Sequence, residues 1–176
     1  MKVLRKIAII FGIVVLVVLA SLWVRSITVN KSEAPQTAGS DHRYTQGTPD
    51  PQEMLELVNA ERAKAGVKPL TIDENVQKSA QLKAEDMDRR NYFSHIVKGT
   101  KYTLTEEMAV YVRKSCKHSS ENITDNLVDR DNTSEQSVYN WIHSPPHYKA
   151  MIDPKYTYTG FGVSGTKIVQ HFCVAK

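Results

Sequence analysis

The sequence lacks a net charge over most of its length. Four cations near the amino terminus account for the whole formal charge of +4, and the other 19 lysines and arginines balance 19 aspartates and glutamates: the four are Lys2, Arg5, Lys6 and Arg25. The high isoelectric point therefore does not indicate a basic surface, and no nucleic-acid partner is expected. The chain also lacks internal repeats, long runs of like charge and an H-E-x-x-H motif.

Long hydrophobic runs are scarce too, with one exception between Ile7 and Val24. This uncharged stretch of 18 residues would form a helix about 27 Å long, close to the ~30 Å thickness of a bilayer core. It is apolar all round, whereas a helix at the surface of a soluble core has a polar face. Two interpretations stay open: an uncleaved transmembrane anchor, or a signal peptide cleaved near Ala20.

The charges around this run predict the topology and the location of the protein. Three cations precede the run and one follows it, so residues 1–6 are expected in the cytoplasm and the rest outside the membrane. Residues 25–50 hold few large apolar side chains and are expected to form a flexible linker. Residues 51–176 suffice for one domain. We expect a single-pass membrane protein with an extracytoplasmic domain, or a secreted protein if residues 7–24 are removed.

Capping residues and hydrophobic periodicity predict helices first and paired strands last. The first helix is expected to start at Pro51, with Asp50 as its cap, and to end before Gly66. The other expected helices cover 71–90, 103–114, 134–142 and a short segment at 147–152, and the expected strands cover 156–163 and 167–174. This order predicts an α+β fold with helices packed over an antiparallel sheet.

The two cysteines, Cys116 and Cys173, are expected in a compartment that permits disulfides. A bridge between them would close a long loop, and two buried thiols are the alternative. Spacing alone leaves both open.

Three side chains are candidates for chemistry: His95, Glu121 and His147. Two imidazoles and one carboxylate suit a divalent metal with one open coordination position. The same groups could act as general acid and base. Taken singly, each has an ordinary explanation, such as a helix cap or a solvated acid.

Five short motifs follow one another from about residue 52 to the carboxyl end. They are Leu57-Val58-Asn59-Ala60-Glu61-Arg62, Tyr92-Phe93-Ser94-His95, Glu121-Asn122-Ile123, Trp141 with Ser144 and His147, and Gly160-Phe161-Gly162-Val163. In this order they resemble the CAP superfamily of cysteine-rich secretory, antigen 5 and pathogenesis-related proteins (SCP domains), in its compact bacterial form. The resemblance implies an α-β-α sandwich with a central antiparallel sheet.

The resemblance also implies a cleft with a His, Glu, Glu, His tetrad, which binds zinc or another divalent cation in several members. His95, Glu121 and His147 occupy three of these positions. The second Glu is replaced by Ser144, a poor metal ligand, so we expect weak metal binding. Asn122, Ser144 and the neighbouring His143 are expected to contact a ligand.

We therefore expect an exported, membrane-tethered module that binds a lipid, a wall fragment or a protein in a His/Glu/His cleft. Such a module need not be an enzyme. One alternative is a metal-assisted hydrolase of peptide or envelope polymer with Glu121 as general base. The other is a structural or adhesion module whose cleft is vestigial.

Overall fold

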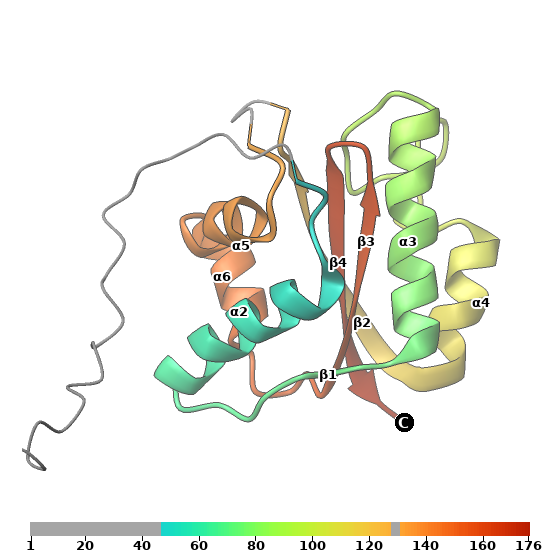
Figure 1. Cartoon of the computed structure of the whole chain (residues 1–176). Helices are drawn as coiled ribbons and strands as arrows, with labels where there is room; N and C mark the ends of the chain where they lie inside the picture. The colour runs from blue at the N-terminus through green and yellow to red at the C-terminus, as the bar shows by residue number, and fades with distance from the viewer. Residues whose placement is uncertain (1–46, 128–130) are drawn as a thin grey trace, which may run out of the picture. The chain divides into compact units, whose positions relative to one another are not determined.

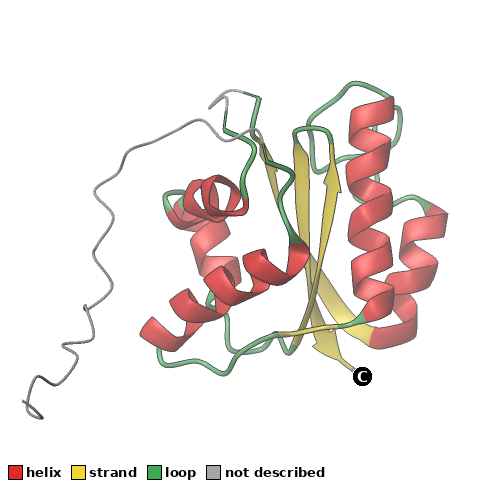
Figure 2. Cartoon of the chain, viewed as in Figure 1, coloured by secondary structure: helices red, strands yellow, loops and turns green. Residues whose placement is uncertain are grey.

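The computed structural model describes residues 47–127 and 131–176, which form five helices around a four-stranded sheet (Figures 1 and 2). In chain order these elements are α2 (Pro51–Lys64), β1 (Thr71–Ile72), α3 (Glu74–Arg89), α4 (Glu106–Ser115), β2 (Cys116–Asp125), α5 (Ser134–Ile142), α6 (Pro145–Met151), β3 (Tyr158–Ser164) and β4 (Lys167–Ala175). The expected anchor at 7–24 lies outside the described residues, as does the expected linker up to residue 46. Within the described part, no helix is long and apolar enough to cross a bilayer.

The sheet has the strand order β1-β3-β4-β2 and is mixed. The β3–β4 and β2–β4 pairs are antiparallel, whereas β1 runs parallel to β3. The expectation of a purely antiparallel sheet is therefore wrong at β1. The reason is that the chain leaves β1 into α3 and returns to β3 only after α6, and such a long crossover permits a parallel pair.

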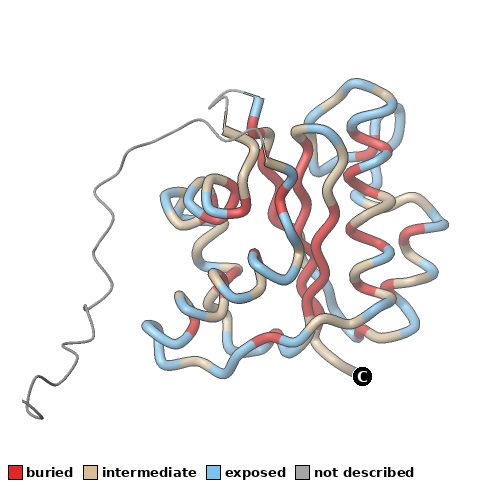
Figure 3. The backbone as a smooth tube through the Cα atoms, viewed as in Figure 1, coloured by how far each residue is buried: buried red, intermediate tan, exposed pale blue. Residues whose placement is uncertain are grey.

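The helices form a layer on each face of the sheet (Figure 1). One layer holds α3 and α4, and the other holds α2, α5 and α6. Figure 3 shows that the strands between the layers are largely buried, whereas the outer sides of the helices are exposed. The apolar side chains of β3 and β4 divide accordingly: Phe161 and Phe172 pack in the α2, α5 and α6 layer, and Val169 packs with Ala84 of α3.

The helix α3 packs directly against the backbone of β3. A Cβ atom on Gly160 would overlap the backbone of Gln77, and one on Gly162 would overlap the backbone of Ala80. Beyond the two residues of β1, glutamine side chains of α3 complete the outer edge of β3: Gln77 accepts from the amide of Phe161, and Gln81 bonds both backbone groups of Val163. The two glycines therefore let a helix approach closely enough to satisfy the edge of a strand.

Local signals located most of the helices. Asp50 caps α2 by accepting from the amides of Gln52 and Glu53, as expected. The expected bounds of α5 are confirmed. The second and third helices start at Glu74 and Glu106 instead of the expected 71 and 103, because Asp73 and Thr105 supply the caps.

The expected bounds differ more at two other places. The short helix α6 begins at Pro145, before the expected start at 147, because proline is favoured at the first helical position. The strand β2 was not expected, because its sequence is mostly polar and its register is set by pairing with β4.

The two cysteines form a disulfide. Cys116 opens β2, Cys173 lies in β4, and their Cα atoms are 5.4 Å apart. Of the two alternatives left open by the sequence, the bridge is confirmed. It links β2, the strand that carries Glu121 and Asn122, to its partner strand β4.

Candidate functional site

The candidate site lies along β2, an edge strand of the sheet. Glu121 of β2 stands directly opposite His171 of β4 in the strand register. The Nδ1 atom of His95 lies 2.7 Å from one carboxylate oxygen of Glu121, and the Nε2 atom of His171 lies 3.0 Å from the other. Two imidazoles therefore hold both oxygens of one carboxylate.

Glu121 is held as a charged acceptor. Burial alone would raise the pKa of this carboxyl, but the hydrogen bonds from His171 and His95 and the positive charge of Lys83 outweigh it, so that the pKa lies below its ordinary value. An ionised carboxylate can only accept hydrogen bonds. Both facing imidazole nitrogens must therefore donate to Glu121.

The loop that follows α3 carries His95, and a buried lysine holds this loop in place. The Nζ atom of Lys83 donates to the carbonyl oxygens of His95, at 2.8 Å, and Thr103, at 3.3 Å. The side chain of Lys83 is completely buried, and this burial lowers its pKa against the opposing effect of Glu121. The backbone of His95 is thus bound to α3 while its imidazole reaches β2.

The helix α6 brings His147 to the same place from the other helical layer. The ring centroids of His95 and His147 lie 6.3 Å apart. Asn122 of β2, which is buried, donates its side-chain amide to the carbonyl oxygen of His147 at 3.1 Å. Burial, and then repulsion from His95, lower the pKa of His147, which favours the neutral imidazole. The structure therefore gathers the three residues predicted from the sequence.

Two neighbouring cavities adjoin these side chains. One, of about 260 Å³, is lined by His95, Thr103, Leu104, Ser119, Ser120, Glu121 and His171. The other, of about 370 Å³, is lined by Phe93, Ile123, Thr124, Asp125, Asn140, Trp141, Ser144 and His147. His95 lines the first and His147 the second, so the pair of imidazoles marks where the two cavities approach each other.

The remaining predicted contacts divide into two groups. Ser144 lines the larger cavity, and Asn122 positions the backbone of His147. His143 is exposed and lines neither cavity, because its Nδ1 bonds the carbonyl oxygen of Tyr139 and its ring stacks on the Tyr139 ring at 3.8 Å. His143 therefore does not occupy the place of the missing acid.

The sequence analysis missed His171. This imidazole contacts Glu121 only because β2 and β4 pair in a particular register, and no local motif encodes that register. The one available signal was the pair of polar residues, Gln170 and His171, inside the otherwise apolar stretch Ile168–Cys173. Such a residue needs a buried partner.

The arrangement of side chains does not fit a metal ion. Within residues 47–127 and 131–176, no three His, Cys, Asp or Glu side chains form a group that could hold one. Both oxygens of Glu121 already accept an imidazole N–H, and Ser144 supplies no carboxylate. Zinc binding stays a prediction of the family resemblance.

We expect the charged form of Glu121 to make the fold sensitive to acid. Since its pKa is lower in the folded state, its contribution is complete above the ordinary value of 4.5 and is lost as the pH falls through the lowered value. Acid unfolding followed by circular dichroism should therefore be steeper for the wild type than for Glu121→Gln. Parallel curves for the two proteins would contradict this expectation.

The resemblance to SCP domains implied an α-β-α sandwich, and the structure has helices on both faces of its sheet (Figure 1). Residues 55–175 match the family described as "CAP: Cysteine-rich secretory protein family", and the chain belongs to this family.

Two relatives from Bacillus subtilis (strain 168) are similar in sequence. "Uncharacterized protein YkwD" is 35% identical over 147 residues, which cover 80% of this chain and 55% of the relative. "Uncharacterized membrane protein YlbC" is 32% identical over 136 residues, which cover 77% and 38%. The chain thus spans about half or less of the length of these relatives.

A solved structure shares the fold. It is an extracellular protein containing a SCP domain from Bacillus anthracis, with a TM-score of 0.58 and 22% identity, covering 70% of this chain and 39% of that chain. At this identity the likeness supports the fold alone.

Proposed function

We propose that the protein is an exported, membrane-tethered CAP domain that binds a hydroxyl-rich fragment of an envelope polymer in its His/Glu/His cleft, without a metal. Export and tethering are both supported by the apolar run at 7–24 with its flanking cations, and tethering also by the membrane-named relative from Bacillus subtilis. The observation that carries the binding function is the pair of neighbouring cavities at His95 and His147.

The lining of the smaller cavity supports a polar ligand. Its lining residues include three that carry hydroxyl groups, Thr103, Ser119 and Ser120, together with His95. Hydroxyls both donate and accept hydrogen bonds, and imidazoles offer one donor and one acceptor. Such a set matches the alternating donors and acceptors of a saccharide better than an acyl chain.

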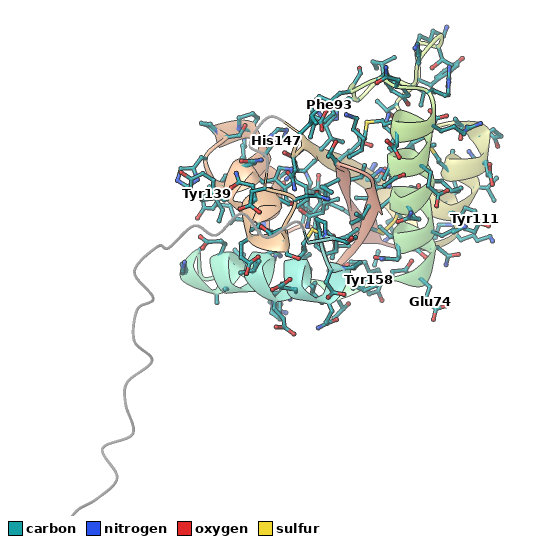
Figure 4. The ribbon with its side chains drawn as sticks, turned by 45° about the horizontal axis from the view of Figure 1, so that its top comes forward. Glu74, Phe93, Tyr111, Tyr139, His147 and Tyr158 are labelled. Atoms are coloured by element: carbon teal, nitrogen blue, oxygen red, sulfur yellow. A yellow bond between two sulfur atoms is a disulfide. The ribbon has the colours of Figure 1, made fainter. Side chains whose placement is uncertain are left out.

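The larger cavity adds an aromatic surface. Phe93 is 48% exposed, and Figure 4 shows its ring in the same region of the surface as His147. The ammonium group of Lys167 lies 5.9 Å from the centroid of the Phe93 ring and forms an ion pair with Asp125. A half-exposed ring beside convergent polar groups suits a flat ligand with an apolar face, such as a pyranose.

The hydrolase alternative finds less support in this geometry. A general base must reach the proton that it removes, but the side chain of Glu121 is only 10% exposed and accepts from two imidazoles. Titration of zinc into the full chain tests this alternative. Tight binding that Glu121→Gln abolishes would favour the hydrolase.

The binding function predicts a measurable loss of affinity in a cleft variant. We expect His95→Ala with His147→Ala to weaken binding of soluble amino-sugar oligosaccharides at least about tenfold, because each lost hydrogen bond costs about 1 kcal/mol. Isothermal titration calorimetry measures the affinity. His118→Ala is the matched control, since His118 is an exposed histidine of β2 that lines neither cavity.

Other outcomes separate the alternatives. Equal affinities of the cleft variant and the wild type would place binding elsewhere. A structural role would give a different set of results. No oligosaccharide would bind, cells with the cleft variant would resemble the wild type, and only deletion of the whole domain would change the cells.

A further inference from the structure

His171 is a buried histidine that the proposed binding function does not itself use. Only 2% of its surface is exposed, although it lines part of the smaller cavity. Its Nε2 atom donates to Glu121, and its Nδ1 atom is buried without a hydrogen-bond partner in the described part of the chain. Burying an imidazole with one unsatisfied nitrogen lowers the stability of the fold. The hydrogen bond from His171 to Glu121 therefore indicates a role for this buried histidine.

The backbone fixes the position of this bond. Glu121 and His171 are directly opposed on two antiparallel strands, and the Cys116–Cys173 disulfide joins the same strands. Side chains of directly opposed residues lie close together on one face of the sheet. The carboxylate of Glu121 is therefore held from the strand side by His171, and its other oxygen meets His95.

The hydrogen bonds also fix which nitrogens carry protons. Each oxygen of the Glu121 carboxylate faces one imidazole nitrogen, and a carboxylate can only accept, so His171 must donate from Nε2 and His95 from Nδ1. A neutral imidazole that carries its proton on Nδ1 has an unshared electron pair on Nε2. Unlike His171, the side chain of His95 is 49% exposed, so a ligand can reach it.

We propose that His171 is a positioning residue that acts through Glu121 to hold His95 in its Nδ1–H tautomer, so that Nε2 of His95 accepts a hydrogen bond from the ligand. This proposal rests on the proposed binding function and specifies its ligand: the group bound at His95 presents an O–H or N–H donor. A saccharide hydroxyl or an acetamido N–H meets this requirement.

The tautomer can be measured without any ligand. In the full chain labelled with ¹⁵N and ¹³C at histidine, long-range nitrogen–carbon correlation spectra show which ring nitrogen carries the proton. The chain has six histidines, and His95→Gln identifies the signals of His95 by their disappearance. We expect His95 protonated on Nδ1 and His171 protonated on Nε2. The opposite tautomer at either residue overturns the proposal.

Two substitutions then test whether His171 acts through Glu121. His171→Phe keeps a ring of similar size in the buried site but removes the donor, and we expect His95 to lose its single tautomer. His171→Gln places an amide donor near the position of Nε2 and should restore the wild-type signature. If His171 had only a structural role, the two variants would not differ in the tautomer of His95, which lies outside β4.

The remaining outcomes are also decisive. An unchanged His95 signature in a folded His171→Phe overturns the positioning role. If His171→Phe does not fold, the tautomers of the wild type and of His171→Gln test the proposal instead. A changed His95 tautomer in a folded His171→Gln also contradicts the proposal. Failure of the binding function is distinguishable, because it would abolish oligosaccharide binding and leave these spectra as expected.

Discussion

Replacing Gly160 with alanine is expected to lower the free energy of unfolding by about 3 kcal/mol or more, or to prevent folding. The added Cβ would overlap the backbone of Gln77, so α3 would have to move away from β3. That movement would break the bond between Gln77 and Phe161 and leave a backbone amide unpaired. Urea denaturation followed by circular dichroism measures the loss.

A glycine elsewhere in the chain provides the control. A Cβ on Gly47 would meet its nearest heavy atom at 3.6 Å, which is an ordinary van der Waals contact. We expect Gly47→Ala to change stability by less than about 0.5 kcal/mol. If Gly160→Ala is as stable as Gly47→Ala, α3 does not need its close approach to β3.

Removing the disulfide by the double substitution of Cys116 and Cys173 with alanine is expected to cost about 4 kcal/mol. The two cysteines are 57 residues apart, and a bridge across a loop of this length removes much of the entropy of the unfolded chain. Chemical denaturation of the wild type and of the double variant measures the difference.

Reduction provides an independent check of the same number. A reductant should destabilise the wild type by a similar amount and leave the double variant unchanged. A double variant that is as stable as the oxidised wild type would show that the bridge does not stabilise the fold.

The sequence located those parts of the fold that local chemistry encodes. Asp50 predicts the start of α2, because a carboxylate at that position can accept hydrogen bonds from two backbone amides of the first turn. The polar strand β2 carries no such signal, because its side chains follow neither an apolar run nor an alternating pattern and its place depends on β4. Local patterns predict helices well here and strand pairing poorly.

The candidate site divides in the same way. His95, Glu121 and His147 were found because each sits in a short motif that resembles a known family. His171 could not be found, because its contact with Glu121 depends on pairing between residues 50 positions apart in the sequence. The cavities were beyond sequence reasoning as well, because their walls combine residues of β2 and β4, of α5 and α6, and of the segment between α3 and α4.

The glutamine side chains on α3 have a consequence for self-association. By bonding both backbone groups of Val163, Gln81 occupies the positions that an incoming strand would use on β3. In the described part of the chain, the opposite rim of the sheet, at β2, has no strand beyond it. A neighbouring polypeptide that extended this sheet at β2 would compete directly with the proposed ligand for access.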